Sequence, residues 1–311
     1  MFIDIHAHVY KDPVPFVTKF YNPKQLLESD KELGIEKTVL LPVVNPEIYF
    51  PQSNEEVLEI ADAYPDHFIP FCNIDPRALT NSPNSDFGEV LEYYKKRGCK
   101  GLGEVMPNMP LMHPKVQNLL RYAEIAGLPV IYDGSDQLDG DFGLYDEPGL
   151  PQLEHTLQRF PNLKIFGHGP TFWAELGELE TPGERGIIFN MKGNQVGRLP
   201  DTPIVREGVV PKLFRRYKNL LGDLSDGSPY AALMRSPEYG AKFLTEFQDR
   251  LFFGTDRCCV GVYPEIINLL KSWKENGMIT ETVFNKITYE NAAKLFGLKS
   301  FGGKYEECNN K

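Results

Sequence analysis

Short runs of consecutive apolar residues alternate along nearly the whole chain with segments whose apolar residues recur at helical spacing. The runs lack the polar–apolar alternation of a half-exposed strand, which is typical of parallel strands covered on both faces. Eight runs are predicted to be strands: Phe2–Ile5, Thr38–Val44, Phe68–Ile74, Gly101–Val105, Leu128–Tyr132, Leu163–Phe166, Leu220–Leu224 and Leu251–Phe253.

The segments between these runs predict helices. In the first, Asn22 is a plausible N-cap, Pro23 suits the first helical position and Gly34 is a C-terminal stop. Other helices are predicted over Asn54–Tyr64, Phe87–Arg97, Lys115–Ala126 and Leu150–Phe160.

Eight strands that alternate with helices imply right-handed βαβ crossovers and an α/β fold. We therefore predict a single-domain (β/α)8 TIM barrel over residues 1–298, with long loops after the strands. A doubly wound open sheet is the alternative. It would need a Gly-rich phosphate turn after the first strand, where His6-Ala7-His8 stands instead.

Three segments depart from this regular pattern. Leu176–Val210 and Gly134–Gly149 are long and rich in Gly, and the second is also rich in Asp, so we expect them to cover an active site. Residues 299–311 form a polar C-terminal tail that we expect to fray.

The composition of the chain excludes some classes of binding partner. The formal net charge is −10, which argues against binding to nucleic acid or to an anionic membrane surface. No apolar run is long enough to cross a membrane, and no signal peptide is apparent. The 5 cysteines follow no metal-site spacing, which suggests a reducing compartment and a cytoplasmic protein. A small-molecule substrate is expected, and a homodimer is compatible with such barrels.

Polar side chains stand at the C-terminal ends of the predicted strands, where α/β barrels carry their catalytic groups. His6 and His8 end the first strand and, two residues apart, point to the same side. Two adjacent imidazoles are half of a site for a divalent cation. The later strands end in Glu104, Asp133, His168, Asp223 and Asp256.

Three motifs in this order resemble the amidohydrolase superfamily, in particular its amidohydrolase-related branch that includes aminocarboxymuconate-semialdehyde decarboxylase. They are Phe2-Ile3-Asp4-Ile5-His6-Ala7-His8, Gly167-His168-Gly169 and Gly254-Thr255-Asp256. The resemblance implies a barrel with one divalent metal, usually Zn2+ and sometimes Mn2+. It implies that His6, His8 and Asp256 are metal ligands and that His168 is a catalytic acid or base.

One position departs from the branch. A histidine usually follows the fifth strand as a further ligand, and here that position is Asp133. A carboxylate can also bind zinc or manganese, and it shifts the preference toward a harder ion. Glu104 is the other candidate ligand, or else a structural acid.

The leading hypothesis is a metal-dependent hydrolase of a small carboxylated or cyclic substrate: an ester, lactone or amide. A metal-activated water would attack the carbonyl, Asp256 would carry a proton, and His168 would stabilise the oxyanion or protonate the leaving group. The alternative is a metal-dependent non-oxidative decarboxylase of an aromatic or unsaturated acid. A metal-free hydrolase and a non-catalytic barrel are further alternatives.

Four side chains are candidates for contact with substrate. Arg77 could hold a carboxylate through two hydrogen bonds, although a structural ion pair is an equal alternative. Tyr132, Trp173 and Tyr230 could line the pocket or simply pack. His67 precedes a strand, so we expect it at the opposite end of the barrel in a stabilising role.

Overall fold

The structure is a computed structural model that describes residues 1–12, 20–48, 51–139, 141–183, 185–186, 199–261 and 263–298. The tail predicted over residues 299–311 lies outside these ranges, as does the middle of the predicted cover, residues 187–198.

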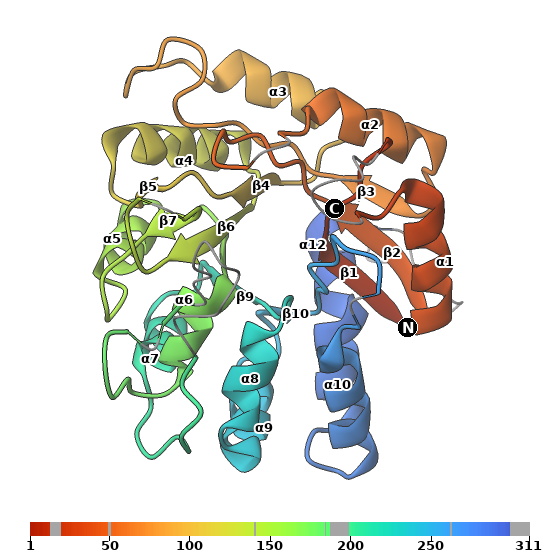
Figure 1. Cartoon of the computed structure of the whole chain (residues 1–311), viewed down its shortest axis with the longest axis vertical. Helices are drawn as coiled ribbons and strands as arrows, with labels where there is room; N and C mark the ends of the chain where they lie inside the picture. Colours follow the sequence, from red (N-terminus) through yellow and green to blue (C-terminus); the bar gives the residue numbers. More distant parts are fainter. Residues whose placement is uncertain are drawn as a thin grey trace, which may run out of the picture.

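Eight parallel strands form the wall of a barrel and follow one another in chain order (Figure 1). Each lies within or overlaps one of the eight predicted runs, so the predicted α/β class is confirmed. The strands are β1 (Phe2–Ala7), β2 (Ile35–Leu40), β3 (Phe68–Pro70), β4 (Leu102–Val105), β6 (Val130–Ser135), β8 (Ile165–His168), β9 (Leu220–Asp223) and β10 (Leu251–Phe252).

Hydrogen-bonded pairing runs β1-β2-β3 in one sheet and β4-β6-β8-β9-β10 in the other. A parallel bridge between Cys72 and Leu102 joins the segment after β3 to β4. A second parallel bridge, between Ala7 and Arg257, joins β1 to the segment after β10. The two sheets are thus linked at both edges, and the strands form a ring.

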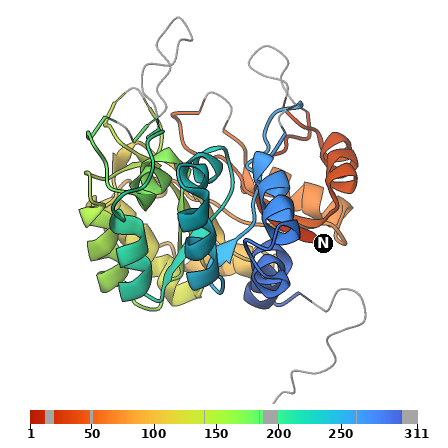
Figure 2. The same cartoon turned by 90° about the horizontal axis from the view of Figure 1, so that it is seen from below.

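Helices surround this ring (Figures 1 and 2). Local sequence explains their limits: in the first helix the Asn22 side chain accepts the N–H of Gln25, and Gly34 adopts the left-handed conformation with φ 76°. The helices are α1 (Pro23–Leu33), α2 (Asn54–Ala63), α3 (Gly88–Lys96), α4 (Pro114–Ala126), α5 (Pro151–Arg159), α6 (Gly169–Trp173), η1 (Ala174–Leu176), α7 (Val209–Arg216), α8 (Ser228–Met234), α9 (Pro237–Glu246), α10 (Glu265–Glu275), α11 (Glu281–Asn285), η2 (Lys286–Glu290) and α12 (Asn291–Phe296).

The barrel is filled by apolar side chains from its strands. One buried cluster joins residues of β1, β2, β6, β8, β9 and β10 with Ala292 and Phe296 of α12. The ring of Phe296 lies 5.7 Å from that of Phe71. Residues of α12 line a cavity together with Lys100, Pro129 and Lys164, which precede β4, β6 and β8, so α12 closes the end of the barrel at which the strands begin. Two short strands, β5 (Met109–Pro110) and β7 (Leu144–Tyr145), extend the opposite end.

Two strands carry an extra residue relative to their neighbours. Asp4 pairs with Thr38 but Ala7 pairs with Leu40, so three steps along β1 match two along β2. The same mismatch occurs in β4, where Leu102 and Val105 pair with residues two apart in β6. Such bulges re-aim side chains. Here they lie at the histidine-bearing end of β1 and around Glu104.

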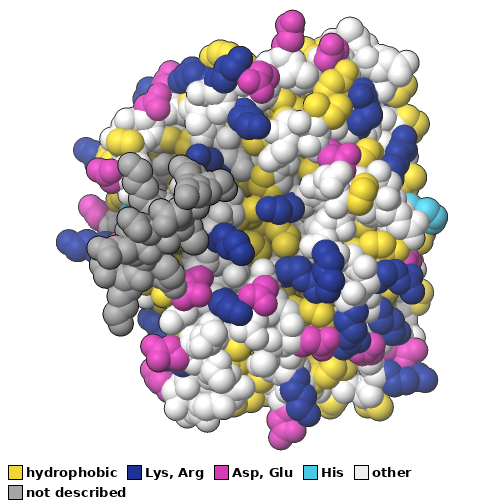
Figure 3. All heavy atoms as spheres, turned by 180° about the vertical axis from the view of Figure 1, so that it is seen from behind, with side chains coloured by type: hydrophobic (Ala, Val, Ile, Leu, Met, Phe, Trp, Pro, Cys, Tyr) yellow, Lys and Arg dark blue, Asp and Glu magenta, His cyan; other side chains and the backbone are white. Residues whose placement is uncertain are grey.

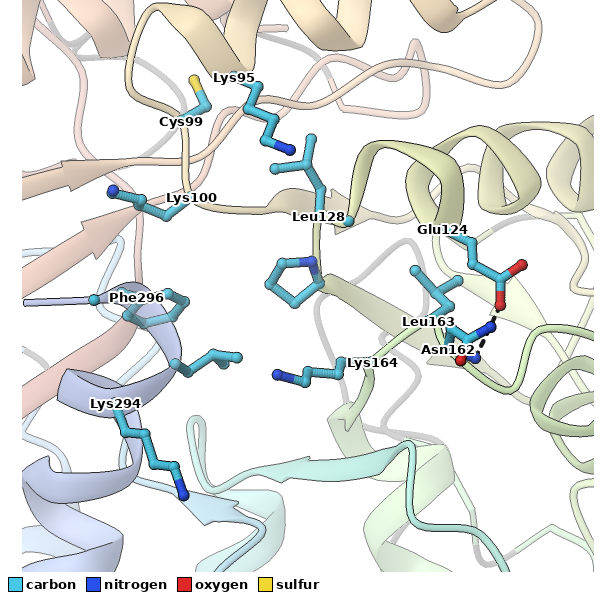
Figure 4. A pocket seen from close by; sticks show the side chains of 14 residues that line it. Lys95, Cys99, Lys100, Glu124, Leu128, Asn162, Leu163, Lys164, Lys294 and Phe296 are labelled. Carbon is cyan, nitrogen blue, oxygen red and sulfur yellow. Dashed lines mark hydrogen bonds between the residues drawn. The ribbon is translucent and has the colours of Figure 1, made fainter. Parts of the chain in front are cut away.

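The end of the barrel closed by α12 also carries a cavity of about 600 Å³ that contains several lysines (Figure 4). The lysines do not converge: Lys95 Nζ donates to the backbone oxygen of Ala126, and Lys100 points away from the middle of the cavity. On the face seen in Figure 3, Lys and Arg side chains surround an apolar area near the middle. Within the described ranges, no helix has the length and apolar character needed to span a bilayer.

Candidate metal centre

The C-terminal ends of six strands bring the predicted polar groups together around one point. His6 and His8 come from the end of β1, and the other strands contribute one residue each at or just after their ends. These are Glu104 of β4, Asp133 of β6, His168 of β8, Asp223 of β9 and Asp256 after β10.

Four of these groups present donor atoms at nearly equal spacing. His6 Nε2 lies 3.2 Å from His8 Nε2, and Glu104 Oε2 lies 3.3 Å from each nitrogen. Asp256 Oδ1 lies 3.5 Å from His6 Nε2 and 3.3 Å from His8 Nε2. Zinc bonds to nitrogen and oxygen of about 2.1 Å in a tetrahedron place neighbouring donors about 3.4 Å apart. His6, His8 and Glu104 therefore form a set of three donors with the spacing of a zinc-sized divalent cation, and Asp256 approaches the same two nitrogens.

Hydrogen bonds at the far side of each imidazole fix which nitrogen faces the centre. His6 Nδ1 lies 2.7 Å from Asp223 Oδ2, and His8 Nδ1 lies 2.9 Å from the backbone oxygen of Leu41. Both partners are acceptors, so each Nδ1 carries the proton in the neutral ring. Each Nε2 then presents its lone pair to the centre, as metal-binding histidines do.

His168 faces the same centre from β8. Its Nδ1 lies 3.0 Å from Ser225 Oγ and 3.3 Å from Asp223 Oδ2. Its Nε2 lies 3.4 Å from Glu104 Oε1 and 4.0 Å from Asp256 Oδ2. These are the carboxylate oxygens outside the four-atom set, so His168 borders that set without being needed to complete it.

Without a bound cation, the centre is rich in negative charge. Burial opposes protonation of the histidines, but the carboxylates around them outweigh it. The pKa of His6 is raised well above its usual range by the charges of Glu104, Asp256 and Asp223. The pKa rises to about 9 for His8 and to about 10 for His168. Imidazoles that retain protons this strongly occupy an environment in which a divalent cation would be stabilised.

Asp133 stands apart from the four-atom set. It is 6 % exposed, and burial followed by the charge of Glu104 raises the pKa of its carboxyl well above the usual range. It lies close enough to Glu104 and His168 to form a second group of potential donors with them. Gly169 leaves room for it, because a Cβ there would lie 2.1 Å from Asp133 Oδ1.

A cavity of about 270 Å³ opens onto the centre. Sequence patterns did not single out several of its lining residues, including Asp226, which lies in the loop after β9, three positions beyond Asp223. Phe142 comes from the predicted Gly134–Gly149 cover. The lining residues are His8, Tyr10, Phe20, Val43, Ile48, Glu104, Met106, Asp133, Phe142, His168, Pro170, Asp226, Asp256 and Cys258.

The four side chains predicted to contact substrate lie elsewhere. Arg77 pairs with Asp75, at 2.6 Å, and with Glu47, at 3.1 Å. Trp173 is fully buried and donates from Nε1 to the backbone oxygen of Asp223.

The two tyrosines also belong to the packing. Tyr132 is 2 % exposed in the core between strands and helices, and Tyr230 packs against that same core. Neither lines the cavity, so the observed placement gives both of them a packing role.

The sequence matches the family model of the amidohydrolases over residues 3–298. The chain belongs to this family, and it is an enzyme of the amidohydrolase superfamily. Members of that superfamily usually bind a metal, and the cluster of histidines and carboxylates offers a site for one.

Solved structures share the fold over almost the whole chain. A probable 2-pyrone-4,6-dicarboxylic acid hydrolase from Acinetobacter baumannii is 16 % identical with a TM-score of 0.55, covering 95 % of this chain and 99 % of its own. An uncharacterised TIM-barrel protein from Bordetella bronchiseptica is 18 % identical with a TM-score of 0.58, covering 95 % and 98 %. A 2,6-dihydroxybenzoate decarboxylase from Rhizobium is 15 % identical with a TM-score of 0.55, covering 96 % and 100 %. No curated protein matches the sequence significantly.

Proposed function

We propose that this protein is a metal-dependent hydrolase that cleaves an ester, lactone or amide bond of a small cyclic substrate. The observation that carries the proposal is the equal spacing of His6 Nε2, His8 Nε2, Glu104 Oε2 and Asp256 Oδ1, at 3.2 to 3.5 Å in five of their pairs. The two nitrogens and the oxygen of Glu104 have the spacing of zinc ligands, and Asp256 can supply a further oxygen, which favours Zn2+ among the common divalent ions.

A bound divalent ion would polarise the substrate carbonyl and lower the pKa of water at the site. The chain supplies the proton transfers. His168 Nε2 faces the cavity, where it can donate a proton to the leaving group. Asp256 Oδ2 lies 4.0 Å from His168 Nε2, so a proton taken from water by Asp256 can reach His168 over a short path.

Asp223 and Ser225 hold the two imidazoles in place for this chemistry. Asp223 Oδ2 accepts from His6 Nδ1 and lies 3.3 Å from His168 Nδ1. The Asp223 carboxylate therefore orients both the His6 imidazole, which belongs to the cation site, and the His168 imidazole, which transfers the proton. Ser225 Oγ lies within 3.2 Å of the same two Nδ1 atoms.

Decarboxylation uses the same donor set and is the second reaction that such a centre can support. It requires an aromatic carboxylate to enter a cavity whose described lining already holds four carboxylates and no Lys or Arg. The lining also holds His8 and His168, whose pKa values are raised, so the preference for hydrolysis rests on Asp133, which stands where the branch usually has a histidine.

The proposal is tested by metal analysis together with turnover. Protein purified without chelator is expected to hold about one zinc per chain and to hydrolyse at least one member of a panel of lactones, cyclic amides and aryl esters. His8→Ala is expected to lose the metal and the activity together.

The control variant is His155→Ala, because His155 is an exposed residue on α5 that leaves the centre untouched. It should retain metal and turnover. A His8→Ala protein with unchanged turnover would overturn the proposal, and carbon dioxide release from hydroxybenzoates without hydrolysis would replace it with the decarboxylase.

A further inference from the structure

Two neighbouring cysteines follow Asp256 in the loop after β10. The Sγ atoms of Cys258 and Cys259 lie 3.2 Å apart, and both side chains are half-buried. Cys258 also lines the cavity that opens onto the centre, so a small molecule that enters the cavity can reach this pair. A thiol that oxidises reversibly often has a second thiol beside it that completes a disulfide.

The backbone of this loop connects the cysteines to the metal centre. The N–H of Asp256 donates to the backbone oxygen of His6 at 2.8 Å, and the N–H of His8 donates to the backbone oxygen of Arg257 at 3.0 Å. Asp256 itself adopts the left-handed conformation with φ 52°. The position of its carboxylate relative to the two histidines therefore depends on the conformation of the residues that directly follow it.

A second set of contacts holds the cysteines from the other side. The N–H of Tyr21 donates to the backbone oxygen of Cys258 at 2.9 Å, and Phe20 forms an antiparallel bridge with Cys259. The ring of Phe20 lies 4.6 Å from that of Tyr10, and both rings line the cavity. A change in the backbone of the two cysteines would thus be felt on both sides of the loop.

A disulfide between adjacent residues requires such a change. Neighbouring Cα atoms are about 3.8 Å apart across a trans peptide bond, whereas disulfides usually join Cα atoms about 4.4–6.8 Å apart. The backbone between Cys258 and Cys259 has to rearrange before the sulfurs can bond. The rearrangement falls on the same residues whose hydrogen bonds place Asp256 beside His6 and His8.

We propose that Cys258 and Cys259 are a reversible modification site, at which a hydroperoxide forms a disulfide that displaces Asp256 and weakens metal binding. The effect on the metal rests on the proposed function, whereas formation of the disulfide does not. The site would make the enzyme sensitive to oxidants that enter its own cavity.

The reaction with hydrogen peroxide has two steps. Burial, followed by the charge of Asp256, raises the pKa of the Cys258 thiol, so Cys259 is the thiol that attacks first. Its sulfur takes one peroxide oxygen as the O–O bond breaks, which gives a sulfenic acid and one water. The Cys258 sulfur then displaces the hydroxyl group, which leaves with the thiol proton as a second water. Two thiols lose two electrons, and the peroxide gains them.

Peptide mass analysis of peroxide-treated, zinc-loaded protein tests the disulfide. Trypsin cleaves after Arg257 and Lys271, so one peptide contains both cysteines and no other cysteine of the chain. After treatment it should resist alkylation and weigh two hydrogen atoms less than the reduced peptide. A phosphine reductant should restore both thiols. Two alkylated cysteines in this peptide, or oxygen atoms added to it without a disulfide, would overturn the proposal.

Competition with a chelator on the same samples tests the link to the metal centre. Oxidised protein should bind zinc about tenfold more weakly than reduced protein, the scale on which loss of a group that positions a ligand acts. The phosphine reductant should restore the affinity. A disulfide that leaves zinc affinity unchanged would contradict the displacement of Asp256.

The variant Cys259→Ser removes one thiol of the pair and retains the backbone bridge with Phe20. Before treatment its zinc affinity and turnover should equal those of the unaltered protein, and peroxide should then change neither. The matched control is Cys99→Ser, since Cys99 precedes β4 at the other end of the barrel and its removal leaves the pair intact. This control should respond to peroxide fully, and a response of Cys259→Ser equal to it would overturn the proposal.

Failure of this inference is distinguishable from failure of the proposed function. The peptide mass reports the disulfide whether or not the protein holds metal. Reduced protein that holds no zinc but forms the disulfide contradicts the proposed function and the link to the metal, and supports the modification site. Protein that binds zinc and hydrolyses the carbonyl panel but keeps both thiols contradicts the modification site alone.

Discussion

His6 Nδ1 lies 2.7 Å from Asp223 Oδ2, although the two residues are 217 positions apart in the chain. Both are fully buried, and the contact joins the first barrel strand to the seventh in chain order. The carboxylate fixes the tautomer of a histidine whose other nitrogen belongs to the four-atom donor set. Partners of this kind raise the basicity of the ligand and hold its ring in place.

Asp223→Asn is therefore expected to weaken zinc binding about 10- to 100-fold, because an amide is a poorer acceptor for two imidazole N–H groups. Competition with a chelator of known affinity measures the change. Ser225→Ala is the control, since it removes the other neighbour of both Nδ1 atoms and leaves the carboxylate. Equal losses in both variants would contradict the role of Asp223.

A second prediction concerns Asp4, which ties β1 to the loop that carries Asp256. Asp4 Oδ1 accepts the backbone N–H of His6 at 3.0 Å and of Thr255 at 2.9 Å. Asp4→Asn should lower zinc affinity about tenfold by loosening the relative placement of the two segments. It should also destabilise the fold by up to about 3–5 kcal/mol, because Arg257 loses a buried partner.

Asp30→Asn separates these two effects. Asp30 is also a fully buried partner of Arg257, but its other contacts are Thr38 within β2 and His67 just before β3. Urea denaturation should show a similar loss of stability, and the zinc affinity should be unchanged. A comparable loss of affinity would mean that Arg257, and not Asp4, positions the centre.

Metal binding should release protons and strengthen with pH. In the metal-free protein the pKa of His8 is about 9, so the ring is charged at neutral pH, whereas a ligand must be neutral. Zinc affinity is expected to rise from pH 7 to pH 9, by at most about tenfold per pH unit for each proton released. Calorimetry in two buffers of different ionisation enthalpy counts the protons, and a pH-independent affinity would contradict the prediction.

The raised pKa of His8 also makes the stability of the metal-free fold depend on pH, in the opposite direction from the zinc affinity. Because the pKa is higher in the folded state than the value of about 6.5 in the unfolded state, protonation of His8 stabilises the fold, and this contribution is complete below pH 6.5. The contribution is lost as the pH rises toward about 9. Metal-free protein should therefore lose stability over this range, while zinc-loaded protein should not, as thermal unfolding at several pH values can show.

Gly103→Ala tests the bulge of β4. A Cβ at Gly103 would lie 2.7 Å from the backbone oxygen of Ile131, and its φ of 154° disfavours any side chain. We expect a loss of ~3 kcal/mol or more in unfolding free energy, with weaker zinc binding because Glu104 must move. Gly98→Ala is matched for positive φ, at 103°, but its Cβ meets nothing within 4 Å, so it should cost only about 1–2 kcal/mol.

The strand ends could be predicted because the strands are parallel. A polar residue that terminates a buried apolar run of such a barrel lies at one rim whatever the details of packing. His6, Glu104 and Asp256 could thus be brought together from sequence, although 250 positions separate the first from the last of them within the chain.

The remaining details depend on register, which sequence patterns do not fix. Tyr132 and Trp173 stand near strand ends like Asp133 does, yet they turn into the layer between strands and helices. Asp226 gave no signal, since an acid after a strand is equally common in a turn. Arg77 was open to two interpretations, and its ion pairs with Asp75 and Glu47 support the structural one.

The extra residues in β1 and β4 make the centre sensitive to the number of amino acids as well as to their identity. Excising one position between Asp4 and Ala7 would restore an unbroken ladder with β2 and exchange the inner and outer faces for everything downstream in that strand. An intact set of histidines would then face the helices. A deletion of one residue in this part of β1 is therefore expected to disrupt the centre more than many substitutions would.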